Sequence, residues 1–166
     1  MALTTAQQAT LKAYIEANPT WVAYNHNSDG ALAISQELAL DASPDVVVWR
    51  SDVAETEVVG NTSGEGTTWD WTVYAALTRQ EQGAYERMFA SGVVNAGLPN
   101  IRQGFVDIFN GPSGADQRAH MSAIAKRLAN DLESVFAVGT GSTAVPATMA
   151  VEGRVSYREI LTVMGW

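Results

Sequence analysis

The chain has 166 residues, with ten Lys and Arg against eighteen Asp and Glu, a formal net charge of −8 and no cysteine. This length suits one domain with a continuous core, and the lack of cysteine excludes a disulfide framework and thiol chemistry. The scattered basic residues argue against nucleic-acid binding, which needs clustered positive charge, and against an anionic membrane surface. We also expect no signal peptide, because MALTTAQQATLK lacks a basic region followed by an apolar run, and no membrane span of about 20 apolar residues.

The N-terminal part of the chain is predicted to form two helices. A capping box at Thr4 and Gln7, or one residue further on, starts a first helix that ends before Pro19. A loop rich in turn formers follows. Ser28 or Asp29 then caps the second helix.

Residues 43–57 carry conflicting signals. Ser43-Pro44-Asp45 supplies an N-cap, a proline at the first helical position and an acid in the first turn. The β-branched and aromatic run Val46 to Trp49 makes a buried strand the competing interpretation. We favour a helix, because the apolar pattern continues at helical period as far as Glu57.

The middle of the chain is predicted to be a surface loop followed by helices. Gly60 to Gly66 is small and polar, cannot bury a core-facing side, and is where we expect mobility. Three helices are predicted after it: a short one from Thr67 through Leu77, one capped by Thr78 and ended by Gly92, and one from Asn100 to the stop at Gly111-Pro112.

The C-terminal part, from Ser113 to Trp166, is predicted to hold a long helix, an extended segment and a short helix. Ser113 and Asp116 favour a helix start, and apolar residues recur at helical spacing as far as Phe136, before Gly139 stops the helix. The extended segment covers about residues 139–155 and contains the alternating stretch ATMAVEG. Ser156 and Glu159 then form a capping box for the terminal helix.

These elements predict a mainly α fold. We expect a compact bundle of about six short helices with one extended segment near the C-terminus. Residues 1–166 are predicted to form a single helical domain.

The residues that could carry chemistry do not form a catalytic pattern. His26 and His120 are the only histidines, lie far apart in the sequence and lack further donors at metal-ligand spacing, so we expect His26 in a solvated loop and His120 on a helix flank. Asp29 could orient His26 as a base, but no activated nucleophile is signalled, which favours a helix-capping aspartate. The glycine-rich stretches NTSGEG and VGTGST lack the lysine of a phosphate-binding loop. We therefore expect no catalytic residue, no metal and no cofactor.

The C-terminal segment contains the residues that we expect at a subunit interface: Met149, Val151 and Trp166. The other tryptophans are expected to fill the core, but a large apolar side chain at a chain end suggests docking onto its own core or a neighbour. Met149 and Val151 lie on one side of the alternating stretch, and a lone strand cannot satisfy its backbone groups. The strand partner is either a hairpin within the subunit or the edge of a neighbouring subunit.

Several stretches carry a resemblance to a known family: MALTTAQQATLKAYIEANP with NSDG, SPDVVVWRS, YERMF, NIRQGF and, most specifically, FAVGTGSTAVPATMAVEGRVSYREI. They resemble small proteins encoded among the virion structural genes of tailed bacteriophages and prophages. The resemblance covers nearly the whole chain. It implies a non-enzymatic head-to-tail connector component, an adaptor or head-completion protein, that forms a ring beneath the portal and has no catalytic residues.

The resemblance also implies partners and a location. The partners are further copies of the chain in a homo-oligomeric ring, the portal protein, and tail or neck proteins, without sequence-specific nucleic-acid binding and without a membrane. The protein is made in the cytoplasm of the bacterial host and resides at the head–tail junction of the virion, where its acidic charge suits a DNA passage because it repels phosphates. The alternatives are a tail-completion or head-decoration protein, and a small phage-encoded enzyme or host-directed regulator.

Overall fold

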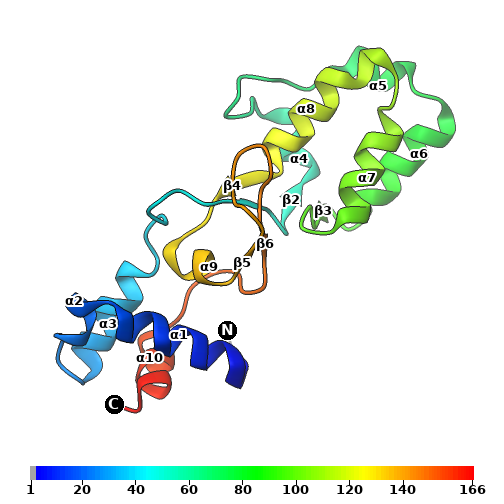
Figure 1. The fold of residues 1–166 in the computed structure, drawn as a ribbon. Helices are drawn as coiled ribbons and strands as arrows, with labels where there is room; N and C mark the ends of the chain where they lie inside the picture. Colours follow the sequence, from blue (N-terminus) through cyan, green and yellow to red (C-terminus); the bar gives the residue numbers. More distant parts are fainter. Residues whose placement is uncertain (1–2) are drawn as a thin grey trace. The chain divides into compact units, whose positions relative to one another are not determined.

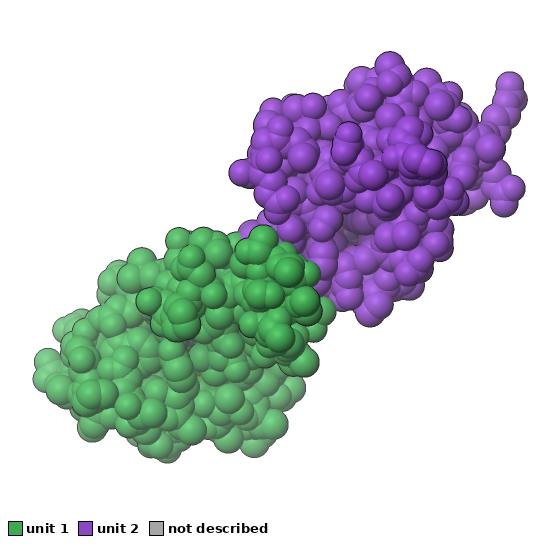
Figure 2. All heavy atoms as spheres, turned by 45° about the horizontal axis from the view of Figure 1, so that its top comes forward, with its two compact units in different colours: residues 1–48, 128–166 green, residues 49–127 purple. Residues whose placement is uncertain are grey.

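The computed structural model describes residues 3–166, which form two compact units (Figure 2). Of these residues, unit 1 comprises 3–48 and 128–166, and unit 2 comprises 49–127. In the sequence, unit 2 therefore lies between the two halves of unit 1. The single helical domain stays a prediction.

The fold is mainly helical, as predicted. Residues 3–166 form ten α-helices, one 3₁₀ turn and three two-stranded sheets (Figure 1). The short sheets make the architecture more mixed than the expected bundle of six helices.

Unit 1 contains five helices and one hairpin: α1 (Thr5–Ala17), α2 (Pro19–Val22), α3 (Ser28–Glu37), α9 (Asp131–Val135), α10 (Tyr157–Met164), β5 (Ala137–Val138) and β6 (Thr148–Met149). The capping boxes predicted at Thr4 and Ser156 are confirmed. The cap of α3 is Asn27, one residue before the predicted Ser28, because its Oδ1 accepts from the backbone N–H groups of Asp29 and Gly30.

The core of unit 1 joins the two ends of the chain. Leu11 and Ile15 of α1, Ile34 of α3, Leu132 of α9 and Ile160 of α10 are fully buried together. Burial of this apolar surface is what holds the N-terminal and C-terminal helices in one unit.

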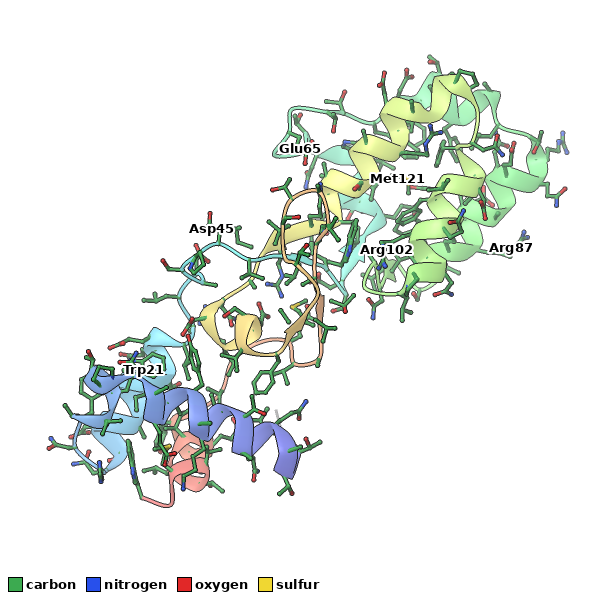
Figure 3. All side chains as sticks on the ribbon, viewed as in Figure 1. Trp21, Asp45, Glu65, Arg87, Arg102 and Met121 are labelled. Carbon is green, nitrogen blue, oxygen red and sulfur yellow. The ribbon has the colours of Figure 1, made fainter. Side chains whose placement is uncertain are left out.

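Trp21, labelled in Figure 3, is buried on the same core. Its indole N–H donates to the Glu37 carboxylate, which also accepts from the Tyr24 hydroxyl at 2.6 Å. These bonds satisfy the polar tips of two large aromatic side chains.

Unit 2 contains five helices, a 3₁₀ turn and one sheet: β2 (Val53–Ala54), α4 (Glu55–Gly60), α5 (Trp71–Ala76), α6 (Arg79–Met88), β3 (Val93–Val94), α7 (Pro99–Ile108), η1 (Pro112–Gly114) and α8 (Ala115–Ile124). β2 and β3 are antiparallel. The predicted capping box at Thr78 starts α6. The core of this unit is aromatic, with tilted and edge-on contacts among Trp69, Tyr85, Phe89 and Phe109.

The four tryptophans other than Trp166 were expected to fill the core, and the structure confirms this for only some of them. Trp21 and Trp69 are buried, and Trp49 and Trp166 are half-buried. Trp71 is 58% exposed at the start of α5, so the prediction is wrong for this residue.

The predicted helix over residues 43–57 is wrong. The chain instead forms β1 (Val47–Trp49), then β2, and enters α4 only at Glu55. β1 pairs with β4 (Lys126–Leu128), and Val48 also bridges to Ala147. Strand partners on both sides explain why the β-branched run prevails over the local helix-start signal.

The predicted long helix from Ser113 to Phe136 is interrupted. α8 ends at Ile124, β4 follows, and Asn130 caps the separate helix α9 with a capping box. Ser113 lies in the 3₁₀ turn and does not cap α8. The backbone of residues 126–128 leaves the helix because it pairs with β1.

The loop predicted at residues 60–66 is irregular from Asn61 onward, but one of its side chains is buried. Ser63 is 5% exposed, and its Oγ accepts from the backbone N–H groups of Glu65 and Thr67. The expectation that these small polar residues stay off the core is wrong at Ser63, because its hydrogen bonds are made locally. The expected mobility stays a prediction.

Candidate functional site

The C-terminal segment that the sequence singled out forms a β-hairpin in unit 1 (Figure 1). β5 and β6 are antiparallel, with Val138 opposite Thr148. The loop between them is closed by its own hydroxyl groups. Thr140 Oγ1 donates to the carbonyl oxygen of Val145 at 2.8 Å, and the N–H of Val145 donates to Ser142 Oγ at 3.0 Å.

The hairpin loop is held against the first strand of the same unit. The N–H of Val47 donates to the carbonyl oxygen of Gly141 at 2.7 Å, and the N–H of Ala147 donates to the carbonyl oxygen of Val47 at 2.9 Å. Gly141 has φ +66°, and a Cβ at this position would lie 2.7 Å from Val46 Cγ1. Both the backbone conformation and the close approach therefore require glycine.

These contacts bear on the two strand partners that the sequence left open. Thr148 and Met149 pair with β5, and Ala147 bridges to Val48, so these strand partners lie within the chain. The structure therefore has the hairpin within the subunit that was one of the two alternatives, and strand addition to a neighbour stays a prediction.

The three residues predicted at a subunit interface contact unit 1 itself. Met149 is half-buried and packs on a small cluster of Val48, Ala129 and Ala147. Val151 is 4% exposed in the main core of the unit. Trp166 packs on the same core, and its ring stacks on His26 with centroids 4.6 Å apart and planes 7° apart.

The hairpin exposes two other apolar side chains, which sequence analysis missed. Val138 is 66% exposed and Val145 is 58% exposed, and we refer to them as the hairpin valines. Residues 138–150 contain no charged side chain. This low charge was the available signal, but only the register of the hairpin tells which apolar residues face outward.

His26 and Asp29 do not form a catalytic pair. His26 is exposed in the loop before α3, as predicted, and its imidazole also stacks on Trp166. Asp29 is exposed in the first turn of α3, where its negative charge interacts favourably with the positive end of the helix dipole. The prediction that Asp29 caps this helix is wrong, because the N-cap of α3 is Asn27.

His120 is fully buried in unit 2, where the sequence predicted a helix flank. Its Nε2 lies 2.7 Å from the carbonyl oxygen of Val58, so Nε2 carries the proton, because a carbonyl oxygen only accepts. Nδ1 then accepts from the Thr67 hydroxyl at 3.1 Å, and Thr67 Oγ1 accepts from the Ser63 hydroxyl at 2.7 Å. This chain of bonds fastens the loop after α4 to α8, and it places no activated nucleophile beside the imidazole.

Within residues 3–166, no three His, Cys, Asp or Glu side chains are grouped so that they could hold a metal ion. Across the same residues, no helix combines the length and apolar character needed to cross a membrane. Comparisons with protein-family models, curated proteins and solved structures find no match to this chain.

Proposed function

We propose that this chain is a non-enzymatic virion assembly protein, a subunit of a head-to-tail connector ring between the portal and the tail of a tailed bacteriophage. The proposal rests on the resemblance of the stretches SPDVVVWRS and FAVGTGSTAVPATMAVEG to such proteins. The observation that carries it is that these two stretches, far apart in the sequence, fold onto each other. The bonds between Val47 and Gly141 and between Ala147 and Val47 join them.

The hairpin valines give this paired segment an assembly surface. A ring subunit needs a surface that fits a different surface of its neighbour, so that rotation closes the ring. Val138 and Val145 are exposed on a hairpin without charge, so covering them removes apolar surface from water and buries no unpaired charge. The hydrogen bonds to Val47 hold this surface in one conformation before binding, which lowers the entropy cost of association.

The proposed partners are other copies of the chain, the portal protein and the neighbouring tail or neck proteins. The proposed location is the head–tail junction, after synthesis in the host cytoplasm. A net charge of −8 suits a subunit that lines the DNA passage, because it repels phosphates.

Mass spectrometry of purified virions tests the proposal directly. We expect the protein in every particle at the low copy number of a single closed ring. Absence from the particle would refute the assembly function. Hundreds of copies would favour the head-decoration alternative over the neck ring.

The role of the hairpin is tested with Val138→Asp and Val145→Asp. Each change places a charge on the proposed contact surface, and we expect incorporation into particles to fall by at least about tenfold, because an unpaired charge is costly to bury. Val22→Asp is the matched control, since Val22 is 46% exposed on α2, outside the hairpin. Normal incorporation of both hairpin variants, with unchanged thermal unfolding, would contradict this role.

The enzyme or regulator alternative is tested at His26. Its imidazole is outside the buried core of unit 2, so His26→Ala can be made without disturbing the His120 network. We expect normal particle assembly from this variant. Failure of assembly with a folded protein would give His26 a role that our proposal does not contain.

A further inference from the structure

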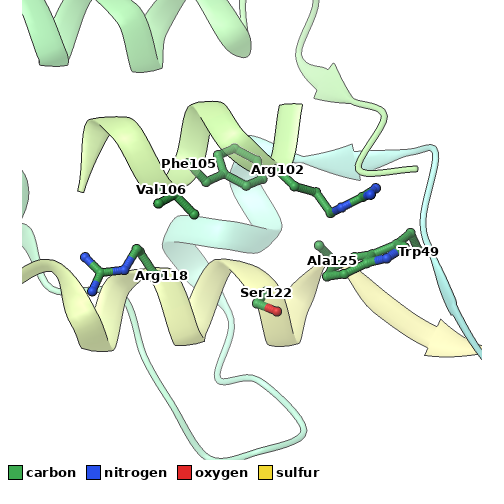
Figure 4. A pocket seen from close by; sticks show the side chains of 7 residues that line it. All are labelled: Trp49, Arg102, Phe105, Val106, Arg118, Ser122 and Ala125. Atoms are coloured by element: carbon green, nitrogen blue, oxygen red, sulfur yellow. The ribbon is translucent and has the colours of Figure 1, made fainter. Parts of the chain in front are cut away.

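A cavity of about 250 Å³ opens in unit 2 beside α7 and α8 (Figure 4). Its walls are mainly apolar and are formed by Trp49, Phe105, Val106, Ala125, Ser122 and the side chains of Arg102 and Arg118. Sites for small organic molecules typically have volumes of roughly 300–1,000 Å³. The size of this cavity suits one apolar side chain better than a cofactor.

Arg102 provides a positive charge at one end of the cavity. Its guanidinium lies 4.9 Å from the ring centroid of Trp49, and the two side chains face each other in Figure 4. Its Nη1 donates to the carbonyl oxygen of Ala96 at 2.6 Å, but it forms no ion pair within residues 3–166. Burial lowers the pKa of Arg102, because the charged form loses solvation. A carboxylate at this end would therefore be stabilised by a charge-assisted hydrogen bond.

Arg118, on the far side of the cavity, is already engaged. It donates to the backbone carbonyl oxygens of Phe109 and of Gly111, and its guanidinium points away from the cavity in Figure 4. These carbonyl groups lie at and after the C-terminal end of α7, where a positive charge is favoured. The cavity therefore selects an apolar group with one carboxylate beside it, at the Arg102 end.

Unit 1 of the same protein presents such a group. Leu40 is 64% exposed and is followed by the exposed Asp41. Their backbone is fixed, because the N–H of Asp131 donates to the carbonyl oxygen of Leu40 at 2.8 Å, and that of Ala42 donates to the carbonyl oxygen of Ala129 at 3.0 Å. A fixed leucine beside an aspartate matches both requirements of the cavity.

The two units differ in net charge, and unit 1 is the more acidic one. Unit 1 has three Lys and Arg against nine Asp and Glu, and unit 2 has seven against nine. The net charge is therefore −6 in unit 1 and −2 in unit 2, although each unit has nine acidic residues. Association of unit 1 of one copy with unit 2 of another brings the more acidic unit to the guanidinium of Arg102, which has no ion-pair partner within residues 3–166.

We propose that the cavity beneath Arg102 and Trp49 receives Leu40 and Asp41 from a second copy of this chain. This contact joins two different surfaces, so it propagates from one copy to the next and closes into a ring when the rotation permits. The inference rests on the proposed function, because it describes how neighbouring subunits of the ring meet.

Cross-linking between introduced cysteines tests the contact. Because the sequence has no native cysteine, the reagent reacts only with the introduced thiols. The double variant carries Leu40→Cys and Val106→Cys, and Val106 lies at the exposed rim of the cavity. A short bismaleimide then joins the thiol introduced at position 40 of one copy to the thiol introduced at position 106 of the next. We expect a ladder of covalent oligomers from purified particles. The matched control is Leu32→Cys with Val106→Cys, since Leu32 is 44% exposed elsewhere in unit 1.

A charge exchange tests the chemistry of the contact in the cross-linking background. Asp41→Arg should lower the cross-linked fraction by at least about tenfold, and adding Arg102→Glu should restore it, because opposite charges again face each other. Asp45→Arg, an exposed acid in the same segment, should change the fraction by less than about twofold. Restoration by the second change also shows that the first did not simply unfold the protein.

The outcomes separate this inference from the proposed function. Protein in the particles without a ladder, equal cross-linking of the control pair, or cross-links confined to single chains would overturn the contact and leave the virion assignment intact. Absence of the protein from particles would refute the virion assignment. In that case the same cross-linking is done on the concentrated purified protein. A ladder of covalent oligomers supports the contact between copies, and its absence overturns the contact.

Discussion

At the scale of single residues, the buried bonds of His120 make a prediction about stability. Thr67→Val keeps the shape of the side chain but removes the hydroxyl that donates to Nδ1 of His120. Because a buried acceptor then loses its partner, we expect the free energy of unfolding of unit 2 to fall by about 1–3 kcal/mol. Urea denaturation followed by tryptophan fluorescence measures the loss. Thr68→Val, at the exposed neighbouring position, is the control, and equal losses in both variants would contradict the prediction.

A second residue-scale prediction concerns acid. Glu57 accepts from Arg50 Nη2 at 2.9 Å and from the N–H of Ala54 at 3.0 Å, and these bonds hold the pKa of Glu57 below its ordinary value of 4.5. A lowered pKa in the folded state stabilises the protein above the ordinary value, and this stabilisation is lost as the pH falls through the folded pKa. We expect Glu57→Gln to reduce the loss of stability of unit 2 on acidification.

Urea titrations from about pH 6 to about pH 3 measure the difference, since the titration of a carboxylate falls in this range. Glu55→Gln, at another acid in the first turn of α4, is the matched control. An unchanged acid dependence in Glu57→Gln would show that the pair with Arg50 contributes nothing to it.

At the scale of elements, the sequence predicted what depends on local signals. The capping boxes at Thr4, Thr78 and Ser156 start the helices that were predicted from them, because their hydrogen bonds join residues three apart. The two wrong helices, at residues 43–57 and 113–136, have one shared cause. β1 and β4 pair with each other. The apolar pattern within either segment contains no information about a strand partner that is distant in the sequence.

The candidate site was predictable only in part, for a related reason. The sequence located the segment, through its low charge and its alternating stretch. It named Met149 and Val151, which face inward, while the exposed residues are Val138 and Val145. Which face is buried depends on the register of the hairpin and on the contact of Gly141 with β1, and neither can be read from the alternation itself.

The terminal helix α10 makes a prediction at the element scale. It buries Ile160 and Val163, and the Ser35 hydroxyl of α3 donates to the carbonyl oxygen of Val155 just before it, at 2.7 Å. We expect deletion of residues 156–166 to unfold unit 1, because several buried side chains lose their contacts at a cost of about 2–5 kcal/mol each. Circular dichroism and hydrogen exchange measure the loss. Persistent protection of α1 and α3 from exchange in the truncated chain would contradict the prediction.

At the scale of the whole molecule, each of the two units has a main core of its own. Leu11, Ile34 and Ile160 belong to the core of unit 1, and Tyr85 and Phe109 belong to that of unit 2. A helical pattern tells which face of an element is apolar, but it does not tell which other element covers that face. The insertion of unit 2 was therefore not readable from the pattern of apolar residues.

Separate cores predict that unit 2 folds without unit 1. Residues 49–127 are contiguous and contain a complete aromatic core, and the N–H of Arg50 donates to the carbonyl oxygen of Ala125 at 2.9 Å, so the two ends of the fragment meet. We expect the excised fragment to unfold cooperatively on heating, as small domains with their own core do. Its circular dichroism and calorimetry provide the measurement.

The reciprocal variant replaces residues 49–127 with a short glycine–serine linker. The N–H of Ala129 donates to the carbonyl oxygen of Val46 at 2.8 Å, so a short linker spans the gap in unit 1 without strain. If either piece is a random coil although the intact chain unfolds in one transition, the two units form one cooperative domain. If both fold, the hairpin of unit 1 and the cavity of unit 2 can be tested for binding as separate molecules.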